Sequence, residues 1–540
     1  MNARQNDLAA DYVVVGAGSA GCVMAARLSE DPGTSVLLLE AGGDDFNRWI
    51  HIPLGFGKTF ADPSVNWCYE TEPDPGANNR KIYWPRGKVL GGSSSINGMV
   101  YIRGQHEDFD LWRQFGCTGW SAQDVLPYFK RAEHQVRGAD DWHSTGGPLA
   151  VSDVQDGHPL CEAFISACNA LGFPTNPDFN GATQDGVGYH QTTTQNGRRC
   201  STAVGYLHPA RSRRNLRVVT GALAERLLFE GRRATGVAFR QDGFARIARA
   251  RREVILCGGA INSPQLLLLS GVGPQQHLTD LGIPVVHDLP GVGQAMQDHY
   301  SAPIKLKCRF PITVNDIMLS PVKMLRTGLD YYLRRRGAMA SISAQVALFA
   351  RTRPELATPD IKMSISVFSA DRPQDGLHKF SGFTIIVYQL RPESRGEIRL
   401  KTPRPEDAPA MMPNYLATET DRRTIVEGLK LGRRLLATPQ LGHYVAEEFL
   451  PGPAVASDAQ WLEHARNRGG TVYHPTSTCK MGIDAMAVVD PALRVHGLGG
   501  LRVVDASVMP TVVSGNTNAA TIMIAEKAAD LVRQELLVAA

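Results

Sequence analysis

The first forty residues of the chain restrict its fold more than any other segment. A β-branched run at 11–15 leads directly into the glycine-rich turn 16–21, whose sequence is Gly-Ala-Gly-Ser-Ala-Gly. A helix-forming run follows at 22–28, and a second apolar run at 35–39 leads to Glu40. Continuous apolar runs of this length are typical of buried parallel strands. The order strand, glycine turn, helix, strand, acidic residue therefore predicts a doubly wound α/β sheet that binds a dinucleotide.

Each residue of this motif has a separate physical task. Gly16 lets the chain turn tightly, Gly18 lets the backbone approach a pyrophosphate, and Gly21 lets the helix pack closely against the strand. The N-terminus of the helix offers free N–H groups and a partial positive charge to phosphate. Glu40 can accept hydrogen bonds from ribose hydroxyls, and its negative charge disfavours NADP. The motif alone does not separate NAD from FAD.

Two further segments carry glycines where a cofactor would need them. The segment 84–104 has Gly91 and Gly92 followed by three serines, with neither a helical nor a strand period. Its backbone donors can approach an extended ligand such as FAD, and the alternative is a surface loop. The run 253–257 meets Gly258 and Gly259, which favours a further strand of the sheet that returns to the cofactor. An ordinary strand–helix corner is the alternative there.

The C-terminal part contains the residues suited to chemistry. His474 stands between Tyr473 and Pro475, and the short run 502–504 leads to Asp505. A polar loop at 512–521 opens into a strong helix-forming run at 522–532. This order predicts a second helix N-terminus that points at an anionic cofactor edge. One histidine among fifteen indicates little by itself.

Composition and missing motifs exclude several classes of protein. The net charge is +4 over 540 residues, without the clustered basic stripe of nucleic-acid-binding domains. The short basic run Arg334, Arg335 and Arg336 is interpreted as a solvated face. Neither a serine-hydrolase G-x-S-x-G motif nor a P-loop occurs. No metal site is expected, because no histidine and cysteine cluster has the spacing of zinc ligands.

The nine cysteines are scattered without a C-x-x-C pair, which favours free thiols and a cytoplasmic location. No signal peptide is recognised at the N-terminus. No stretch reaches the roughly 18 unbroken apolar residues that a transmembrane segment needs. The sequence leaves peripheral contact with a membrane surface open.

Taken together, these segments resemble the glucose–methanol–choline (GMC) flavoprotein oxidoreductase family. The resemblance extends from residue 11 to about 536 and is strongest to bacterial choline dehydrogenase-like and alcohol dehydrogenase-like members. It rests on these segments: 16–21, 86–104, 259–273 with Ser-Gly-Val-Gly-Pro, 473–475, and the Asn-Ala-Ala-Thr-Ile-Met-Ile helix at 518–524.

The resemblance implies a mixed fold, α/β and α+β, in which a Rossmann-like FAD-binding domain is interleaved with a substrate domain. The FAD-binding domain is expected at 1–155, 195–305 and 468–540. The substrate-binding domain is expected at 156–194 and 306–467, built on an antiparallel sheet flanked by helices. The runs 382–390 and 396–400 are predicted as strands of that sheet.

The resemblance also implies the activity and its residues. The reaction is FAD-dependent oxidation of a primary alcohol to an aldehyde by hydride transfer to flavin N5, with His474 as general base and Asn518 holding the alcohol oxygen. The residues implied to bind FAD are Gly16, Ala17, Gly18, Ser19, Ala20, Gly21, Glu40, Ala41, Arg86, Gly91, Gly92, Ser93, Asn97, Gly98, Met99, Val100, Ala224, Gly259, Asp505 and Ala506.

Two departures from the family pattern refine this prediction. Ile96 stands where some members attach FAD through a histidine, so non-covalent FAD is expected. Gln345 stands where choline-specific members resemble one another in an acidic residue, and a neutral amide disfavours choline. Aliphatic, aromatic and furanic alcohols remain open, as do oxygen, a quinone or a cytochrome as electron acceptor. The alternatives are a flavin-containing lyase that cleaves cyanohydrins, an NAD-dependent dehydrogenase, and a flavoprotein without chemistry of its own.

Overall fold

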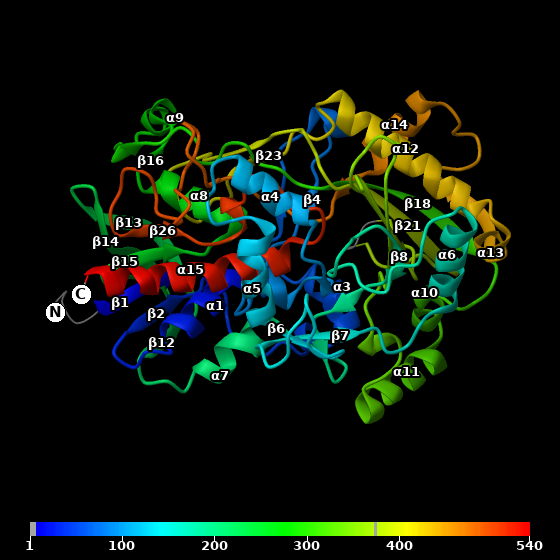
Figure 1. Ribbon diagram of the computed structural model, residues 1–540, viewed down its shortest axis with the longest axis horizontal. Coiled ribbons are helices and arrows are strands. Elements are labelled where there is room, and N and C mark those ends of the chain that lie inside the picture. Colours follow the sequence, from blue (N-terminus) through cyan, green and yellow to red (C-terminus); the bar gives the residue numbers. More distant parts are fainter. Residues whose placement is uncertain (1–6, 372–374, 540) are drawn as a thin grey trace.

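The computed structural model describes residues 7–371 and 375–539, and two seven-stranded sheets organise it (Figure 1). The first sheet has the order β12-β2-β1-β15-β14-β13, with β26 also paired to β15. Its strands are β1 (Leu8–Val15), β2 (Val36–Leu39), β12 (Leu216–Val219), β13 (Ala222–Glu230), β14 (Arg233–Gln241), β15 (Phe244–Leu256) and β26 (Leu501–Val503).

The first sheet has the parallel core that the N-terminal motif predicts. Strands β12, β2, β1, β15 and β26 run parallel, and β13 and β14 extend β15 as antiparallel neighbours. Helix α1 (Ser19–Leu28) follows β1 and lies beside α15 (Thr517–Ala539), which in turn packs on α5 (Ala122–Ala132) (Figure 1). Chain segments hundreds of residues apart thus build one layer of helices against this sheet.

The second sheet is antiparallel throughout and has the order β24-β18-β21-β20-β19-β8, with β25 paired to β18. Its strands are β8 (Gly186–Tyr189), β18 (Tyr300–Cys308), β19 (Val346–Ala350), β20 (Ile361–Ser366), β21 (Gly382–Gln389), β24 (Val445–Leu450) and β25 (Gly470–Thr471). The helices α6 (Pro159–Ala170), α12 (Glu419–Leu436) and α14 (Asp458–Arg468) cover one face of this sheet.

The remaining elements lie outside these two sheets and the helices just named. The helices are α2 (Arg48–His51), α3 (Phe56–Thr59), α4 (His106–Gln114), α7 (His208–Ala210), α8 (Gly259–Leu269), α9 (Gln275–Asp280), α10 (Val314–Met318), α11 (Pro321–Arg334) and α13 (Pro439–Gly442), with single turns at η2 (Pro53–Gly55), η3 (Pro75–Ala77), η4 (Gly92–Ser95), η5 (Ala203–Leu207), η6 (Ala338–Ala340) and η7 (Ala506–Val508). The strands are β3 (Tyr69–Glu70), β4 (Tyr83–Trp84), β5 (Val100–Tyr101), β6 (Glu133–Gln135), β7 (Leu149–Asp153), β9 (Gln191–Thr192), β10 (Thr194–Gln195), β11 (Arg198–Arg199), β16 (Val272–Gly273), β17 (His287–Asp288), β22 (Glu397–Arg399) and β23 (Ala410–Met412).

The mixed α/β architecture confirms the predicted fold class, with one local correction. The run 382–390 forms β21 in the large antiparallel sheet, whereas the run 396–400 forms β22 and pairs with β23 in a separate two-stranded sheet. The N–H groups of Gly396 and Ile398 donate to the carbonyl oxygens of Met296 and Gly293, outside the large sheet, so the chain has left that sheet before β22. The residue boundaries of the two predicted domains stay a prediction.

The two faces of the second sheet differ in character. Ile361, Met363 and Val387 belong to the apolar core under the covering helices. The opposite face carries Phe349 and Tyr388, which pack with Val472 and Val100 in a small separate cluster. Val472 and Val100 also line the pocket that Gly16, Gly18 and His474 line, so this face of the sheet is turned towards that pocket. Within the described residues, no helix has the length and apolarity to cross a membrane.

Candidate active site

A pocket lies at the carboxyl ends of β1, β2 and β15, where Val15, Leu39 and Leu256 line it. In open α/β sheets, ligands bind at this edge. Nineteen of the 22 residues predicted for the site line the pocket: Gly16, Gly18, Ser19, Ala20, Glu40, Ala41, Arg86, Gly92, Ser93, Asn97, Gly98, Met99, Val100, Ala224, Gly259, His474, Asp505, Ala506 and Asn518. Ala17, Gly21 and Gly91 lie just behind its wall and support it.

The first glycine turn is tight enough to require glycine. Gly16 has a φ of +97°, and a Cβ there would lie 2.6 Å from the carbonyl oxygen of Cys257 at the end of β15. A Cβ at Gly21 would lie 1.8 Å from the carbonyl oxygen of Gly16, so α1 can approach the turn only without a side chain. Helix α1 begins without a side-chain cap, which leaves its first N–H groups to a ligand.

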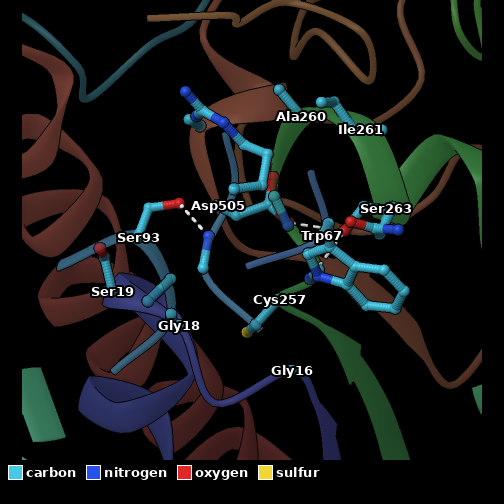
Figure 2. Close-up of a pocket in the computed structure, with 18 of the residues that line it drawn as sticks. Gly16, Gly18, Ser19, Trp67, Ser93, Cys257, Ala260, Ile261, Ser263 and Asp505 are labelled. Atoms are coloured by element: carbon cyan, nitrogen blue, oxygen red, sulfur yellow. Dashed lines mark hydrogen bonds between the residues drawn. The ribbon is translucent and has the colours of Figure 1, made fainter. Parts of the chain in front are cut away.

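The second glycine-rich segment packs directly on the first. A Cβ at Gly92 would lie 2.6 Å from the Cα of Gly18, and the N–H of Gly91 donates to the carbonyl oxygen of Ala17 at 2.7 Å. Figure 2 shows Gly18, Ser19 and Ser93 gathered on one side of the pocket. The two segments therefore form one continuous wall, although some seventy residues separate them in the chain.

Glu40 stabilises the backbone of this wall through two hydrogen bonds. Its Oε2 accepts from the N–H of Ala17 and its Oε1 from the N–H of Gly42, each at 2.8 Å. Burial raises the pKa of Glu40 to about 7. The carboxylate lines the pocket with one lone pair on each oxygen still free for a ribose hydroxyl.

Asp505 joins the last parallel strand to the start of α8. Its Oδ2 accepts from the N–H of Gly259 at 2.9 Å and from the hydroxyl of Ser263 at 2.6 Å, and its Oδ1 accepts from the N–H of Ser507 at 2.8 Å. These hydrogen bonds place Asp505 opposite the glycine wall, beside Ala260 and Ser263 (Figure 2).

His474 enters the pocket from a loop anchored to the second sheet. Strand β25 pairs with β18, and the N–H of His474 then donates to Oδ1 of buried Asp298 at 2.8 Å. Tyr473, between them, has a φ of +70°, which is strained for a side chain of this size. The guanidinium of Arg86 donates to the carbonyl oxygen of Tyr473 at 2.6 Å. The backbone is thus fixed on both sides of the imidazole.

A chain of hydrogen bonds fixes which nitrogen of His474 carries the proton. His299 Nε2 lies 2.9 Å from the carbonyl oxygen of Leu390, which can only accept, so this nitrogen is protonated. Burial lowers the pKa of His299 to about 4, so its ring is neutral at pH 7 and its Nδ1 carries a lone pair. His474 Nδ1 lies 2.9 Å from that Nδ1 and must therefore donate to it.

These contacts also determine the protonation of the second ring nitrogen of His474, Nε2. Burial lowers its pKa well below the usual value, so the ring is neutral and its Nε2 is an unprotonated acceptor. Nδ2 of Asn516 lies 3.0 Å from this Nε2. The lone pair of Nε2 therefore accepts from the amide of Asn516, which also lines the pocket.

Buried Lys362 settles the orientation of the Asn516 amide. Its Nζ donates to Oδ1 of Asn516 at 3.0 Å, which leaves the NH₂ group to face His474. Lys362 stands on the pocket face of β20, directly opposite Phe349 and Tyr388 on the neighbouring strands. Burial lowers the pKa of Lys362 to about 7, and among the described residues no carboxylate forms an ion pair with it.

The amide that hydrogen-bonds to His474 is that of Asn516, two residues before Asn518. Asn518, expected to hold the alcohol oxygen, lies in the first turn of α15, and its Oδ1 accepts from the Ser19 hydroxyl at 2.7 Å. Asn516 precedes that helix and is the amide beside His474. Two residues correspond to about 200° around a helix, so the two side chains of Asn-Thr-Asn leave its axis in different directions.

Sequence reasoning missed Asp298, His299, Lys362 and Asn516. Asp298 and His299 form an ionisable pair directly before a buried strand, which is the one local signal that could have drawn attention to them. Lys362 lies in a strand whose residues are all buried, and a buried lysine is unusual enough to suggest a function.

The pocket is suited to an extended dinucleotide with a ring system near His474. A Cβ at Gly18 would meet only the carbonyl oxygen of Cys257, at 3.9 Å, and Cβ atoms at Gly98 and Gly259 would meet nothing within 4 Å. These glycines leave their backbone bare towards the pocket, so a flat ligand or a phosphate can approach it closely. The free N–H groups of α1 and the carboxylate of Glu40 match the pyrophosphate and ribose of FAD.

A Rossmann-like glycine turn and a buried neutral histidine thus line one pocket, the arrangement expected of a flavin-dependent oxidoreductase. The chain belongs to the GMC oxidoreductase family, whose N-terminal and C-terminal models match residues 10–301 and 392–525. It is 44% identical to an alcohol dehydrogenase [acceptor] from Pseudomonas putida over 97% of this chain and 95% of the relative. It is 45% identical to an oxygen-dependent choline dehydrogenase from Paraburkholderia phymatum over 97% of this chain and 92% of the relative.

Solved structures agree with this assignment. The pyridoxine 4-oxidase from Mesorbium loti superimposes with a TM-score of 0.88 at 31% sequence identity, covering 97% of this chain and 99% of that one. The protein is therefore an FAD-dependent enzyme that oxidises alcohols, acting on CH–OH donors, as predicted.

Proposed function

We propose that the enzyme oxidises a primary alcohol to an aldehyde, with His474 Nε2 as the general base and the Asn516 amide as the donor to the alcohol oxygen. The observation that carries this proposal is the hydrogen-bond chain from Leu390 through His299 to His474, which leaves Nε2 unprotonated. FAD, when bound, accepts the hydride from the alcohol carbon. The substrate hydroxyl would replace the Asn516 amide as the donor to Nε2, its proton would pass to Nε2, and the freed amide N–H would stabilise the charge that develops on oxygen.

Coupling of the two transfers follows from the acidity of alcohols. An alcohol hydroxyl has a pKa of about 16, like water, whereas free imidazole has one of about 6.5. Complete deprotonation before hydride loss would therefore cost about 13 kcal/mol with a free imidazole as the base, and more with His474, whose pKa is lower. A preorganised donor such as Asn516 supplies about 3 kcal/mol of this. Proton and hydride transfer are accordingly closely coupled, with the proton somewhat ahead.

Anaerobic mixing with a panel of alcohols tests the reaction, since alcohol oxidation bleaches the flavin and cyanohydrin cleavage does not. His474→Ala is expected to slow flavin reduction by orders of magnitude and to keep its FAD. Asn516→Ala is expected to slow it about 100-fold, the value of one preorganised donor. Asn518→Ala, the matched control, keeps the Asn516 donor and should lose much less. Near-normal flavin reduction in His474→Ala would remove this residue from the mechanism.

Substrates with a permanent positive charge are disfavoured in this proposal. The relatives include choline dehydrogenases, so the argument rests on residues of this chain alone. Gln345 is a neutral amide and offers no full negative charge to balance a permanent cation. The amine of Lys362 is linked to His474 through Asn516, and its protonated form, about half of the molecules at pH 7, repels a cation. Choline should be a poorer substrate than its neutral isostere with a tert-butyl group, and the reverse order would refute this. Neutral aliphatic, aromatic and furanic alcohols stay open.

FAD is proposed to bind without a covalent bond. Ile96 lines the pocket at the position where some family members have a histidine, and its side chain offers no nucleophile. Denaturation of the holoenzyme should therefore release all of its flavin. The electron acceptor, whether oxygen, a quinone or a cytochrome, is to be identified by re-oxidation of the reduced enzyme with each. The cytoplasmic location stays a prediction, supported by nine cysteines that are all free.

A further inference from the structure

Helix α11 presents apolar side chains to solvent. It projects from the edge of the molecule at the lower right of Figure 1, joined to α10 by a short turn. Val322, Leu325, Leu329 and Leu333 are 76%, 66%, 51% and 78% exposed. Met318 and Leu319, just before the helix, are also about half exposed. Single exposed apolar residues are common, but a row of them on one element is not.

The row is a single stripe on the outer face of the helix. At about 3.6 residues per turn, positions 322, 325, 329 and 333 fall within an arc of roughly 80°. Tyr331 lies on roughly the opposite side and is 1% exposed, so it anchors the helix to the protein. A surface helix normally turns its apolar stripe to the core. In α11 the stripe faces away from the core.

Basic residues are concentrated on the same helix and directly after it. The segment 318–336 contains Lys323, Arg326, Arg334, Arg335 and Arg336 against the single acidic residue Asp330, a net charge of +4. The whole chain of 540 residues has no greater net charge. Long basic side chains beside an apolar stripe can place their charges at the level of anionic headgroups while their stems follow the apolar surface.

We propose that α11 docks the enzyme on the surface of an anionic lipid bilayer, with the stripe Val322, Leu325, Leu329 and Leu333 inserted at the interface. The positive charge of the helix favours an anionic bilayer over a second copy of the chain. Two copies of the chain packed stripe to stripe would bring their basic residues together, which is unfavourable. An anionic bilayer instead attracts the same basic residues, and each of them contributes about 1 kcal/mol to binding near such a surface.

The position of α11 relates this surface to the pocket. The turn η6 follows α11 and packs both on that helix and on η2. Helix α3 begins directly after η2, and Phe60, which follows α3, lines the pocket. A docked α11 therefore places this side of the pocket close to the lipid surface. The proposal is independent of the catalytic roles given above, because it rests on residues outside the pocket.

Sedimentation of the holoenzyme with lipid vesicles tests the proposal. Vesicles of phosphatidylcholine alone are compared with vesicles that also contain phosphatidylglycerol, at low and high salt. The enzyme is expected to bind the anionic vesicles and to be released by salt. The double variant Leu325→Ser/Leu329→Ser should weaken binding by about 100-fold, from the loss of two inserted leucines. Arg326→Gln/Arg334→Gln should weaken binding and reduce its salt dependence.

Controls separate docking from folding and self-association. Phe244→Ser removes an equally exposed apolar residue at the start of β15 and should bind vesicles like the original enzyme. All variants should keep their FAD and their turnover with a water-soluble acceptor. The proposal is overturned if the original enzyme ignores anionic vesicles, or if the leucine variant binds them equally well. It is also overturned if light scattering finds a dimer that the leucine variant dissociates, since a second copy would then cover the stripe.

Discussion

Replacing Lys362 with methionine should make the protein more stable in acid and at the same time a poorer catalyst. The native pKa of Lys362 is about 7, against 10.5 for an ordinary lysine. The unfolded chain thus binds more protons than the native protein between these values, so stability rises with pH across this window. Below pH 7 the buried charge costs its full amount, about 5 kcal/mol for a shift of this size. The cost shrinks to about 2 kcal/mol near pH 9.

Removing the ammonium also leaves Oδ1 of Asn516 without its donor, which costs about 1–3 kcal/mol. Lys362→Met should therefore gain about 3 kcal/mol at pH 6 and almost nothing near pH 9. Flavin reduction should slow about tenfold, because the Asn516 amide is then free to turn its oxygen towards His474. FAD should stay bound, since Lys362 does not line the cofactor pocket.

Urea denaturation of the holoenzyme at both pH values measures the stability change, and anaerobic stopped-flow mixing measures the rate. Lys81→Met, at an exposed position, is the matched control and should change neither. A Lys362→Met protein that is less stable than the original at pH 6, or whose gain is equal at both pH values, would refute the reasoning.

Two further substitutions test the site itself. His299→Leu should keep FAD but slow flavin reduction about tenfold or more, because His474 loses the acceptor that keeps the proton on Nδ1; an unchanged rate would mean that His299 does not set the tautomer. Gly92→Ala should lower FAD affinity, because its Cβ would meet the Gly18 backbone at 2.6 Å and push the two glycine segments apart, whereas Gly43→Ala, with nothing within 4 Å, should bind FAD normally in the same equilibrium titration.

The parts of the site that could be predicted from sequence are those whose residues are close together in the chain. The turn 16–21 and Glu40 form a contiguous motif whose geometry is imposed by the chain itself, and the pocket is lined accordingly. His474 was found through resemblance to a family rather than through its surroundings.

The partners of His474 could not be predicted in the same way. His299 and His474 lie 175 residues apart, and Lys362 and Asn516 lie 154 apart, so only the folded sheet brings them together. The choice between Asn516 and Asn518 depends on where α15 begins, and boundaries of elements are the least certain part of a sequence-based prediction. The apolar period of α11 is visible in the sequence, but which face meets the core is decided by Tyr331 in the folded protein.

His474 and Asn516 come from segments on different sheets, and this restricts how substrate and product can enter and leave the pocket. The loop carrying His474 is tied through β25 to the antiparallel sheet, whereas Asn516 leads into α15 on the parallel one. A hinge motion between the two sheets would separate His474 from Asn516, so the enzyme would be inactive whenever it opened. Entry of the alcohol and release of the aldehyde are therefore expected to depend on peripheral segments, such as residues 53–60 with η2, α3 and Phe60. The two sheets are expected to stay rigidly joined.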